Sequence, residues 1–174
     1  TNFNGTDTFT WKANDGTVDS GTGTVNITIN AVNDVPVSSA VSASTNEDTA
    51  KAITLSATDV EGSSLTYSIV SNPSNGSLGS VSGTSVTYTP SANWNGTDTF
   101  TYKANDGELD SNIATATVTV AAVNDAPTVN DISTTIDENL TARLVGITLD
   151  GADVDGDDLT YSIVSNASNG TTSI

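Results

Sequence analysis

The sequence predicts an all-β protein made of tandem seven-stranded β-sandwiches joined end to end. Three observations lead to this prediction. The chain repeats itself at an offset of about 91 residues, which marks tandem structural units. Segments rich in Thr, Val, Ile and Tyr alternate between apolar and polar residues, and turn residues separate them roughly every ten positions. No segment carries the apolar spacing of a helix over two turns.

The repeat is visible in two long stretches of the chain. Residues 2–20 read NFNGTDTFTWKANDGTVDS and residues 93–111 read NWNGTDTFTYKANDGELDS, an offset of 91 residues. Residues 65–76 read LTYSIVSNPSNG and return at 159–170 as LTYSIVSNASNG, an offset of 94. Three additional residues are therefore inserted in the last copy, downstream of Glu138.

These offsets divide the chain into three parts. We expect the C-terminal part of a unit at 1–34, a complete unit at 35–125 and the N-terminal part of a third unit at 126–174. Both cuts fall inside units, which indicates an excerpt of a longer polypeptide. The linkers AVNDVP and AVNDAP end in proline, which fixes its own φ and pushes the preceding residue into an extended form, so we expect semi-rigid joints.

The complete unit contains seven strand candidates, at 37–44, 50–57, 64–70, 77–79, 84–89, 98–104 and 112–121. The last is the clearest, because alternate residues are apolar and predict one buried face: Ala114, Ala116, Val118 and Val120. Phe100 and Tyr102 alternate in the same way. By alignment, the first unit should bury Val25, Ile27, Ile29 and Trp11, while Trp94 aligns with Phe3 near a loop.

Composition excludes several classes of function. The chain has 4 basic and 21 acidic residues, a net charge of -17, and no His, Cys or Met. Such a charge disfavours binding to nucleic acid and to anionic membranes. The usual catalytic bases and nucleophiles are missing, and the paired carboxylates recur once per unit, so we expect no enzyme. No apolar run is long enough to insert into a membrane. The charges cluster at loops between well-patterned strands, which argues against disorder.

Acidic residues and asparagines recur at fixed places in each unit. The linkers carry Asn-Asp pairs, and an acidic pair before a glycine follows downstream, as Asp-Val-Glu-Gly at 59–62 and Asp-Val-Asp-Gly at 153–156. Each unit has an early glutamate, Glu47 or Glu138. One aspartate ends an Asn-Gly-Thr-Asp loop and another lies in an Asn-Asp-Gly turn. In a simpler interpretation, these residues only form turns and add solubility.

Clustered carboxylates suit a hard divalent cation. Like charges a few ångströms apart repel, which costs stability. Ca²⁺ takes about six to eight oxygens from carboxylates, amides and backbone carbonyls, whereas Mg²⁺ prefers fewer protein ligands. Zn²⁺ is disfavoured because the chain has no His or Cys. We therefore expect Ca²⁺ as the cofactor.

The run Ala-x-Asp-x-(Asp/Glu)-Gly-x-x-Leu-Thr-Tyr-Ser-Ile resembles the motif of cadherin repeats, and the Asn-Asp-x-Pro linker resembles the cadherin linker. The Glu-Asp-Thr signature and the NGTDTF segments are closer still to the bacterial cadherin-like repeat of about 95 residues, which occurs in tandem in large surface adhesins, RTX-type adhesins among them. The resemblance covers the whole chain. It implies seven-stranded Greek-key sandwiches with Ca²⁺ at each junction.

Carried over residue by residue, the resemblance implies two junction sites. The first would take linker residues and loop residues of the following unit, with one weaker candidate from the preceding unit: Asn33, Asp34, Asp59, Glu61, Asp106 and, more weakly, Asp7. The second would take Asn124, Asp125, Asp153, Asp155, the early Glu47, whose family counterpart reaches the far end of its own domain, and Asp98. Ala31 and Ala122 stand where cadherin linkers carry an aspartate, which implies fewer or weaker ions.

The sequence thus predicts a calcium-stiffened spacer in a large extracellular adhesin or surface filament, secreted or at a bacterial cell surface. It would mediate cell adhesion or attachment to matrix or biofilm. The expected partners are neighbouring repeats and, in a filament, identical chains; no nucleic acid and no membrane are expected. Two alternatives stay open, namely a self-assembling filament subunit completed by strand exchange and a module that binds a glycan or a protein.

Overall fold

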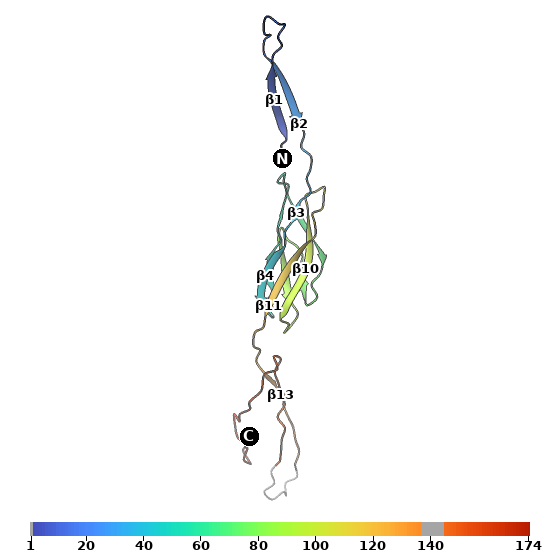
Figure 1. Ribbon diagram of the computed structural model, residues 1–174. Coiled ribbons are helices and arrows are strands. Elements are labelled where there is room, and N and C mark those ends of the chain that lie inside the picture. Colours follow the sequence, from blue (N-terminus) through green and yellow to red (C-terminus); the bar gives the residue numbers. More distant parts are fainter. Residues whose placement is uncertain (1, 137–144) are drawn as a thin grey trace. The chain divides into compact units, whose positions relative to one another are not determined.

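A computed structural model describes residues 2–136 and 145–174 of the chain, and its regular elements in these ranges are all β-strands (Figure 1). Two compact units are present, Thr1–Ala121 and Ala122–Ile174, and each is described by itself. In the described ranges, no helix is available that could cross a membrane.

One sheet of the sandwich in the first unit has four strands in the order β4-β11-β10-β7. These strands are β4 (Val41–Asn46), β11 (Ala114–Ala121), β10 (Gly96–Asn105) and β7 (Thr66–Ser71). The long strand β10 pairs antiparallel with β11 on one side and with β7 on the other. β4 lies parallel to β11 and forms the edge of the sheet.

The opposite side of the sandwich has three strands in the order β5-β9-β8, together with a short pair of strands. The three strands are β5 (Lys51–Thr54), β9 (Ser85–Pro90) and β8 (Gly76–Leu78), and the short pair is β3 (Val37–Ser38) with β6 (Ala57–Thr58). All these pairings are antiparallel. The all-β sandwich predicted from the sequence is confirmed.

The expected strands at 37–44 and 50–57 are each split in two, which the sequence did not predict. The first forms β3 and then β4, and these pair with different partners, β6 and β11. The break falls at Ser39, and the second strand breaks in the same way at Ser56, between β5 and β6. Ser39 N–H donates to the Ser56 carbonyl at 2.9 Å, so the two breaks lie side by side.

The side chain of Tyr102 reaches both strand breaks from the core and forms hydrogen bonds with them. This side chain is fully buried, and its hydroxyl shares one proton between the carbonyl oxygens of Ser39 and Ser56. The Ser56 N–H donates in turn to the tyrosine oxygen at 3.1 Å. Buried backbone groups must be paired, so one hydroxyl satisfies groups that the interrupted strands leave open.

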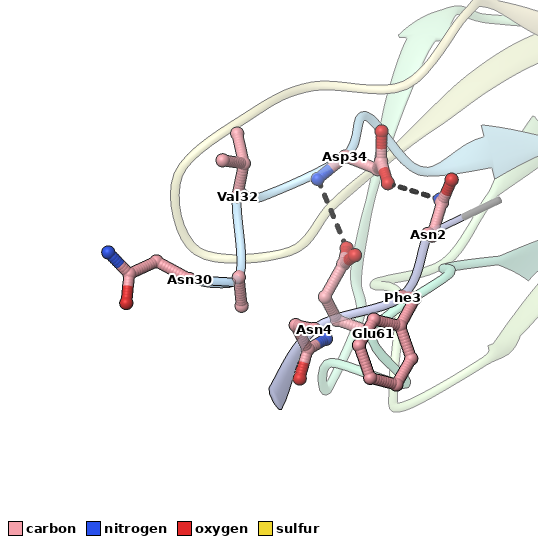
Figure 2. A pocket seen from close by; sticks show the side chains of 8 residues that line it. Asn2, Phe3, Asn4, Asn30, Val32, Asp34 and Glu61 are labelled. Carbon is pink, nitrogen blue, oxygen red and sulfur yellow. Dashed lines mark hydrogen bonds between the residues drawn. The ribbon is translucent and has the colours of Figure 1, made fainter. Parts of the chain in front are cut away.

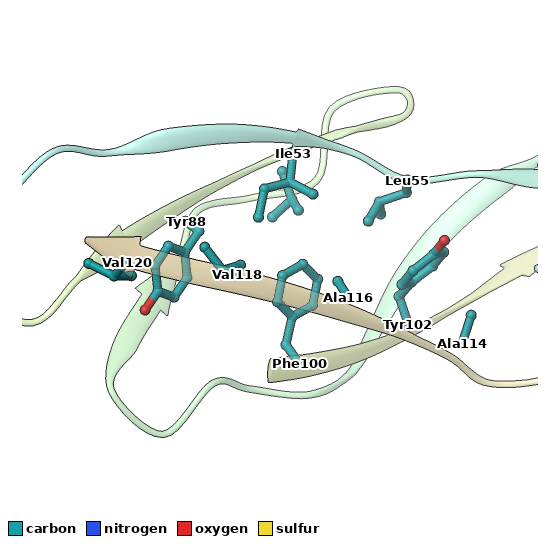
Figure 3. Close-up of a cluster of buried hydrophobic side chains, with 10 residues drawn as sticks. Ile53, Leu55, Tyr88, Phe100, Tyr102, Ala114, Ala116, Val118 and Val120 are labelled. Carbon is teal, nitrogen blue, oxygen red and sulfur yellow. The ribbon is translucent and has the colours of Figure 1, made fainter. Parts of the chain in front are cut away.

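The core lies between the two sheets (Figure 3). β11 alternates as expected: Ala114, Ala116, Val118 and Val120 are buried, and its threonines are exposed or half-buried. β10 buries Phe100 and Tyr102 on the same side. The facing strands contribute the remaining large residues: Ile53, Leu55, Val86 and Tyr88. Trp94 packs against this cluster from its rim.

The first hairpin, β1 (Gly5–Trp11) with β2 (Gly23–Ile29), repeats the register of β10 and β11 but not its burial. Phe9 opposes Val25 as Phe100 opposes Ala116. Yet Phe9 and Trp11 are each 53% exposed, and Ile27 and Ile29 are exposed as well. The expectation that Trp11, Ile27 and Ile29 are buried is therefore wrong, because no described strand covers the hairpin as β5 and β9 cover β10.

Among the described residues of the second unit, β12 (Thr128–Val129) and β13 (Gly151–Ala152) form a short antiparallel pair. Their register, Thr128 opposite Ala152, is that of Val37 opposite Thr58 in the preceding repeat. The counterpart of β7, residues 159–165, forms no strand here.

Replacing Phe100 by alanine should lower the free energy of unfolding of the sandwich by about 3–5 kcal/mol, because a fully buried ring leaves a cavity. The matched control is Phe9→Ala, at the same repeat position but half exposed, which should cost less than about 1 kcal/mol. Urea unfolding of both variants measures the difference. Equal losses would contradict the burial described here.

Candidate functional site

The linker before the sandwich is bonded on three sides. Asn33 Nδ2 donates to Asp106 Oδ2 at 2.8 Å, and the Asp34 N–H donates to Glu61 Oε2 at 3.1 Å. Asn2 Nδ2 donates to Asp34 Oδ2 at 2.5 Å, and Figure 2 shows this contact together with that of Glu61. The linker is thus bonded to the loop after β6, to the turn after β10 and to the segment before β1.

Asp106 both forms a turn and contacts the linker. Its Oδ1 accepts the N–H groups of Glu108 and Leu109, each at 2.7 Å, while Oδ2 faces Asn33. The Leu109 N–H, then the Asn33 amide and the Glu108 N–H, hold the pKa of Asp106 below its ordinary value. The carboxylate is therefore charged at neutral pH. Turn formation explains Oδ1, and the contact with Asn33 is additional to it.

The turn in the first hairpin repeats this geometry without the linker contact. Asp15 Oδ1 accepts the N–H groups of Thr17 and Val18, each at 2.8 Å. The Val18 N–H, then that of Thr17, lowers the pKa of Asp15. The Asn-Asp-Gly turn is thus an intrinsic feature of the repeat, and its contact with a linker depends on tertiary structure.

Asp59 has one paired and one unpaired carboxylate oxygen. Its Oδ1 accepts the Ser63 N–H at 2.8 Å, across a turn whose glycine, Gly62, has a φ of 75°. Its Oδ2 is buried and has no hydrogen-bond partner among the described residues. A buried carboxylate oxygen without a partner is costly, so each such atom requires an explanation. A cation at this position would supply one.

A cavity of about 250 Å³ adjoins the linker. Besides Asp34 and Glu61, it is lined by residues that the sequence-based site did not include: Asn2, Phe3, Asn4, Asn30, Ala31 and Val32. Figure 2 shows Asn2 and Glu61 each joined to Asp34 by a hydrogen bond. The recurrence of Asn-x-Asn-Gly at 2–5 and 93–96 was the signal in the sequence that could have found Asn2 and Asn4.

Asp98 is explained without a metal ion. Its side chain is buried in β10, where Oδ1 accepts the N–H groups of Ser74 and Thr99 at 3.0 and 2.9 Å. Oδ2 accepts the Asn75 N–H at 2.8 Å and the Tyr88 hydroxyl at 3.1 Å. Both oxygens are therefore used to hold the loop before β8. We assign Asp98 a structural role in place of the expected one.

Asp7, the counterpart of Asp98 in β1, is exposed, and its Oδ1 accepts the N–H of Thr8 in its own strand at 2.8 Å. No described hydrogen bond brings it to the linker. Glu47 is buried at the far end of the sandwich, where its N–H donates to the carbonyl of Ala121, the last residue of β11. Its role as a ligand of the second junction stays a prediction. Its counterpart Glu138 lies outside the described residues.

The second unit repeats the contact between linker and loop. The Asp125 N–H donates to Asp155 Oδ2 at 2.7 Å, as the Asp34 N–H donates to Glu61. Asp153 Oδ1 accepts the Asp155 N–H at 2.9 Å, and Asn124 Nδ2 donates to the Asp125 carbonyl at 2.8 Å. These four residues were the expected linker and loop ligands of the second site.

In the described part of the chain, no three acidic side chains gather closely enough to hold a metal ion. The Asp34 carboxylate instead accepts the Asn2 amide, and the Asp106 carboxylate accepts the Asn33 amide. Metal ligation by either set therefore stays a prediction, and the geometry contributes the bonded linker and the unpaired oxygen of Asp59.

In the comparison with protein families, the family described as "Bacterial Ig domain" matches residues 33–120, about half of the chain. This match supports an Ig-like repeat and is broader than the cadherin-like repeat of adhesins, which stays a prediction. No curated protein sequence matches the chain.

Several solved structures are similar over part of their length. An endo-fucoidan hydrolase of glycoside hydrolase family 107 is 24% identical, with 69% of this chain and 19% of that chain covered and a TM-score of 0.44. A second such hydrolase is 19% identical, with 68% and 22% covered and a TM-score of 0.38. A nucleoside hydrolase-related hypothetical protein from Saccharophagus degradans is 19% identical, with 52% and 26% covered and a TM-score of 0.39. The chain spans about a fifth of the length of the fucoidan hydrolases.

Replacing Asp98 by asparagine should lower the free energy of unfolding by about 1–3 kcal/mol, because an amide group would face N–H donors in a buried site. Asp7→Asn, at the exposed counterpart, should have little effect. Urea unfolding should give the same loss with and without Ca²⁺, because the role is structural. A loss that appears only with Ca²⁺ would instead make Asp98 a metal ligand.

Burial, followed by the hydrogen bond and the charge of Asp98, raises the pKa of Tyr88 to about 12. The ordinary value is 10.0, so the unfolded chain loses this proton first. The stabilisation is complete below pH 10 and should be lost as the pH rises toward 12. In the Tyr88→Phe variant, the free energy of unfolding measured in urea should fall less steeply with pH in this range. Equal slopes in the variant and the parent chain would contradict this assignment.

Proposed function

Because this chain belongs to the bacterial Ig domain family, we propose that it is a calcium-stiffened spacer of a large bacterial adhesin or surface filament. In this role, tandem sandwiches hold a terminal adhesive domain away from the cell surface, for adhesion to cells, matrix or biofilm. The spacer needs no catalytic site, and the repeated carboxylates serve the joints between units. Among Ig-like repeats, we identify this one with the cadherin-like repeat, because that repeat occurs in tandem and carries carboxylates at the joints between units.

One observation carries this proposal: the hydrogen bond between the linker and the acidic loop that follows it occurs in two repeats. The Asp34 N–H meets Glu61 before the sandwich, and the Asp125 N–H meets Asp155 in the next repeat. The same contact thus follows a linker of nearly identical sequence in two units. A spacer requires such a reproducible joint, because any variation in angle would accumulate along a tandem array.

Calcium is the cation that we propose for the first joint. The ligands are the linker pair Asn33 and Asp34, the loop residues Asp59 and Glu61, and the turn residue Asp106. The buried, unpaired Oδ2 of Asp59 supports this choice, because a cation would compensate it. The net charge of -17 supports it as well, since bound Ca²⁺ reduces the repulsion among the carboxylates.

Asn2 is an additional ligand candidate from the preceding unit. Its amide already contacts Asp34 Oδ2, and rotation of the amide would exchange the nitrogen for the oxygen. The same rotation would turn Asn33 from a donor to Asp106 into a ligand. Ligands from three segments would then restrain the linker, which is how a bound ion stiffens a joint.

Ca²⁺ should raise the unfolding temperature of the chain, and excess chelator should lower it again. The gain is about 2.7 kcal/mol when free Ca²⁺ exceeds its Kd about a hundredfold. The double variant Asp59→Asn with Glu61→Gln should lose most of this response. The control Glu108→Gln removes an exposed charge from the same end of the sandwich and should keep it.

Small-angle scattering provides the test of stiffening. The scattering curve should indicate a narrower range of conformations with Ca²⁺ than with chelator. Identical melting and identical scattering in the two conditions would contradict the calcium proposal. The stiffness of the spacer would then come from the proline-ended linker alone.

A further inference from the structure

In the part of the chain that the structure describes, two residues other than glycine have a positive φ, Asp48 at 55° and Asn93 at 53°. Residues with a side chain seldom adopt this left-handed conformation, although Asp and Asn enter it more readily than others. The two residues are far apart in sequence but in direct contact, because the Asn93 N–H donates to Asp48 Oδ1 at 3.0 Å. A backbone conformation that the surroundings hold in this way often marks a functional position.

Both residues lie near the end of the sandwich from which the next linker leaves. Asp48 follows Glu47, whose N–H donates to the carbonyl of Ala121 at 2.9 Å, and Ala121 is the last residue of β11. On the other side of Asn93, the side chain of Trp94 packs against the core cluster. Asp48 and Trp94 therefore fix the backbone of Asn93 near the start of this linker.

The preceding repeat shows a contact made from the same position. At the offset of 91 residues, the counterpart of Asn93 is Asn2. The Asn2 side-chain amide donates to Asp34 Oδ2, in the linker that follows its own strands. At the same offset, the counterpart of Asp34 is Asp125. The repeat thus supplies both a donor and an acceptor for an equivalent contact after the complete sandwich.

We propose that Asp48 is a positioning residue of the joint, which holds Asn93 so that its side-chain amide binds the carboxylate of Asp125 in the following linker. This inference rests on the spacer function proposed above. The backbone conformation restricts the side-chain rotamers of Asn93, and therefore the direction of its amide. A donor that is already fixed loses less conformational entropy on binding than a mobile one, which favours a reproducible joint.

The residue types at these positions agree with these roles. Position 48 requires a side chain that accepts an N–H and a backbone that tolerates a positive φ, and Asp and Asn combine the two properties. Its counterpart in the next repeat is Asn139, which lies outside the described residues but has the same two properties. Positions 2 and 93 both carry Asn, whose amide donates to a carboxylate, whereas an Asp there would repel it.

The pH dependence of side-chain amide resonances in NMR spectra tests the contact, with chelator present so that the result does not depend on Ca²⁺. The Asn93 amide should shift over the pH range in which aspartates titrate. Asp125→Asn should abolish this shift. The matched control, Asp34→Asn, should leave it unchanged and should instead abolish the shift of the Asn2 amide, which contacts Asp34. A shift of the Asn93 amide that survives Asp125→Asn, or no shift in the parent chain, would overturn the proposed contact.

Two substitutions of Asp48 separate positioning from a merely structural role. Asp48→Gly keeps a positive φ without strain but removes the acceptor of the Asn93 N–H. It should reduce the shift of the Asn93 amide at least twofold, whereas Asp48→Asn keeps an acceptor and should retain the shift. Because the bond is exposed, we expect nearly equal unfolding temperatures for the two variants. An unchanged amide shift in Asp48→Gly would overturn the positioning role.

Asn93→Gly removes the amide and keeps the backbone conformation, so it isolates the effect of the contact on the joint. In small-angle scattering with chelator, this variant should show a wider range of conformations than the parent chain, and equal curves would overturn the effect on the joint. Melting with and without Ca²⁺ tests the calcium proposal separately. A missing Ca²⁺ response would leave the Asn93 contact standing, and a missing amide shift would leave the calcium proposal standing.

Discussion

The hydroxyl of Tyr102 is the contact on which the position of the linker depends. It binds the carbonyls of Ser39 and Ser56, where the chain breaks between β3 and β4 and between β5 and β6. β3 and β6 are paired directly beyond these breaks, with the buried Pro36 of the linker on one side and the Asp59 loop on the other. A core side chain thus binds the two strand breaks beyond which the linker and the Asp59 loop lie.

The two copies of the β-hairpin separate local pairing from burial. β1 with β2 and β10 with β11 form in the same register, because the alternation and the turn are local properties of nearly identical sequences. Nevertheless, the side chain of Phe9 is half exposed, whereas that of Phe100 is buried. Burial depends on the facing sheet, and the facing sheet comes from residues that are distant in sequence.

In the candidate site, too, some features follow from the local sequence and others depend on distant residues. The Asn-Asp linker, the acidic loop and the Asn-Asp-Gly turn were recognised from their recurrence, and the structure brings Asn33 to Asp106 and Asp34 to Glu61. Asp98 belonged to the same recurring pattern but is enclosed by three N–H groups and a tyrosine hydroxyl. Recurrence of an aspartate does not distinguish a ligand from a buried acceptor, because both are kept in place by the same repeat.

The sequence by itself determined the period, the strand positions, the inward face of β11 and the places where acidic residues gather, because each of these follows from local alternation and spacing. Only the tertiary structure decided that two strands break at Ser39 and Ser56, that Asp98 is internal while Asp59 keeps a buried unpaired oxygen, and that Trp11 is exposed. These features depend on which distant segments meet. A repeated sequence indicates the local structure that each segment prefers. Its burial and its pairing also require a partner segment that covers it.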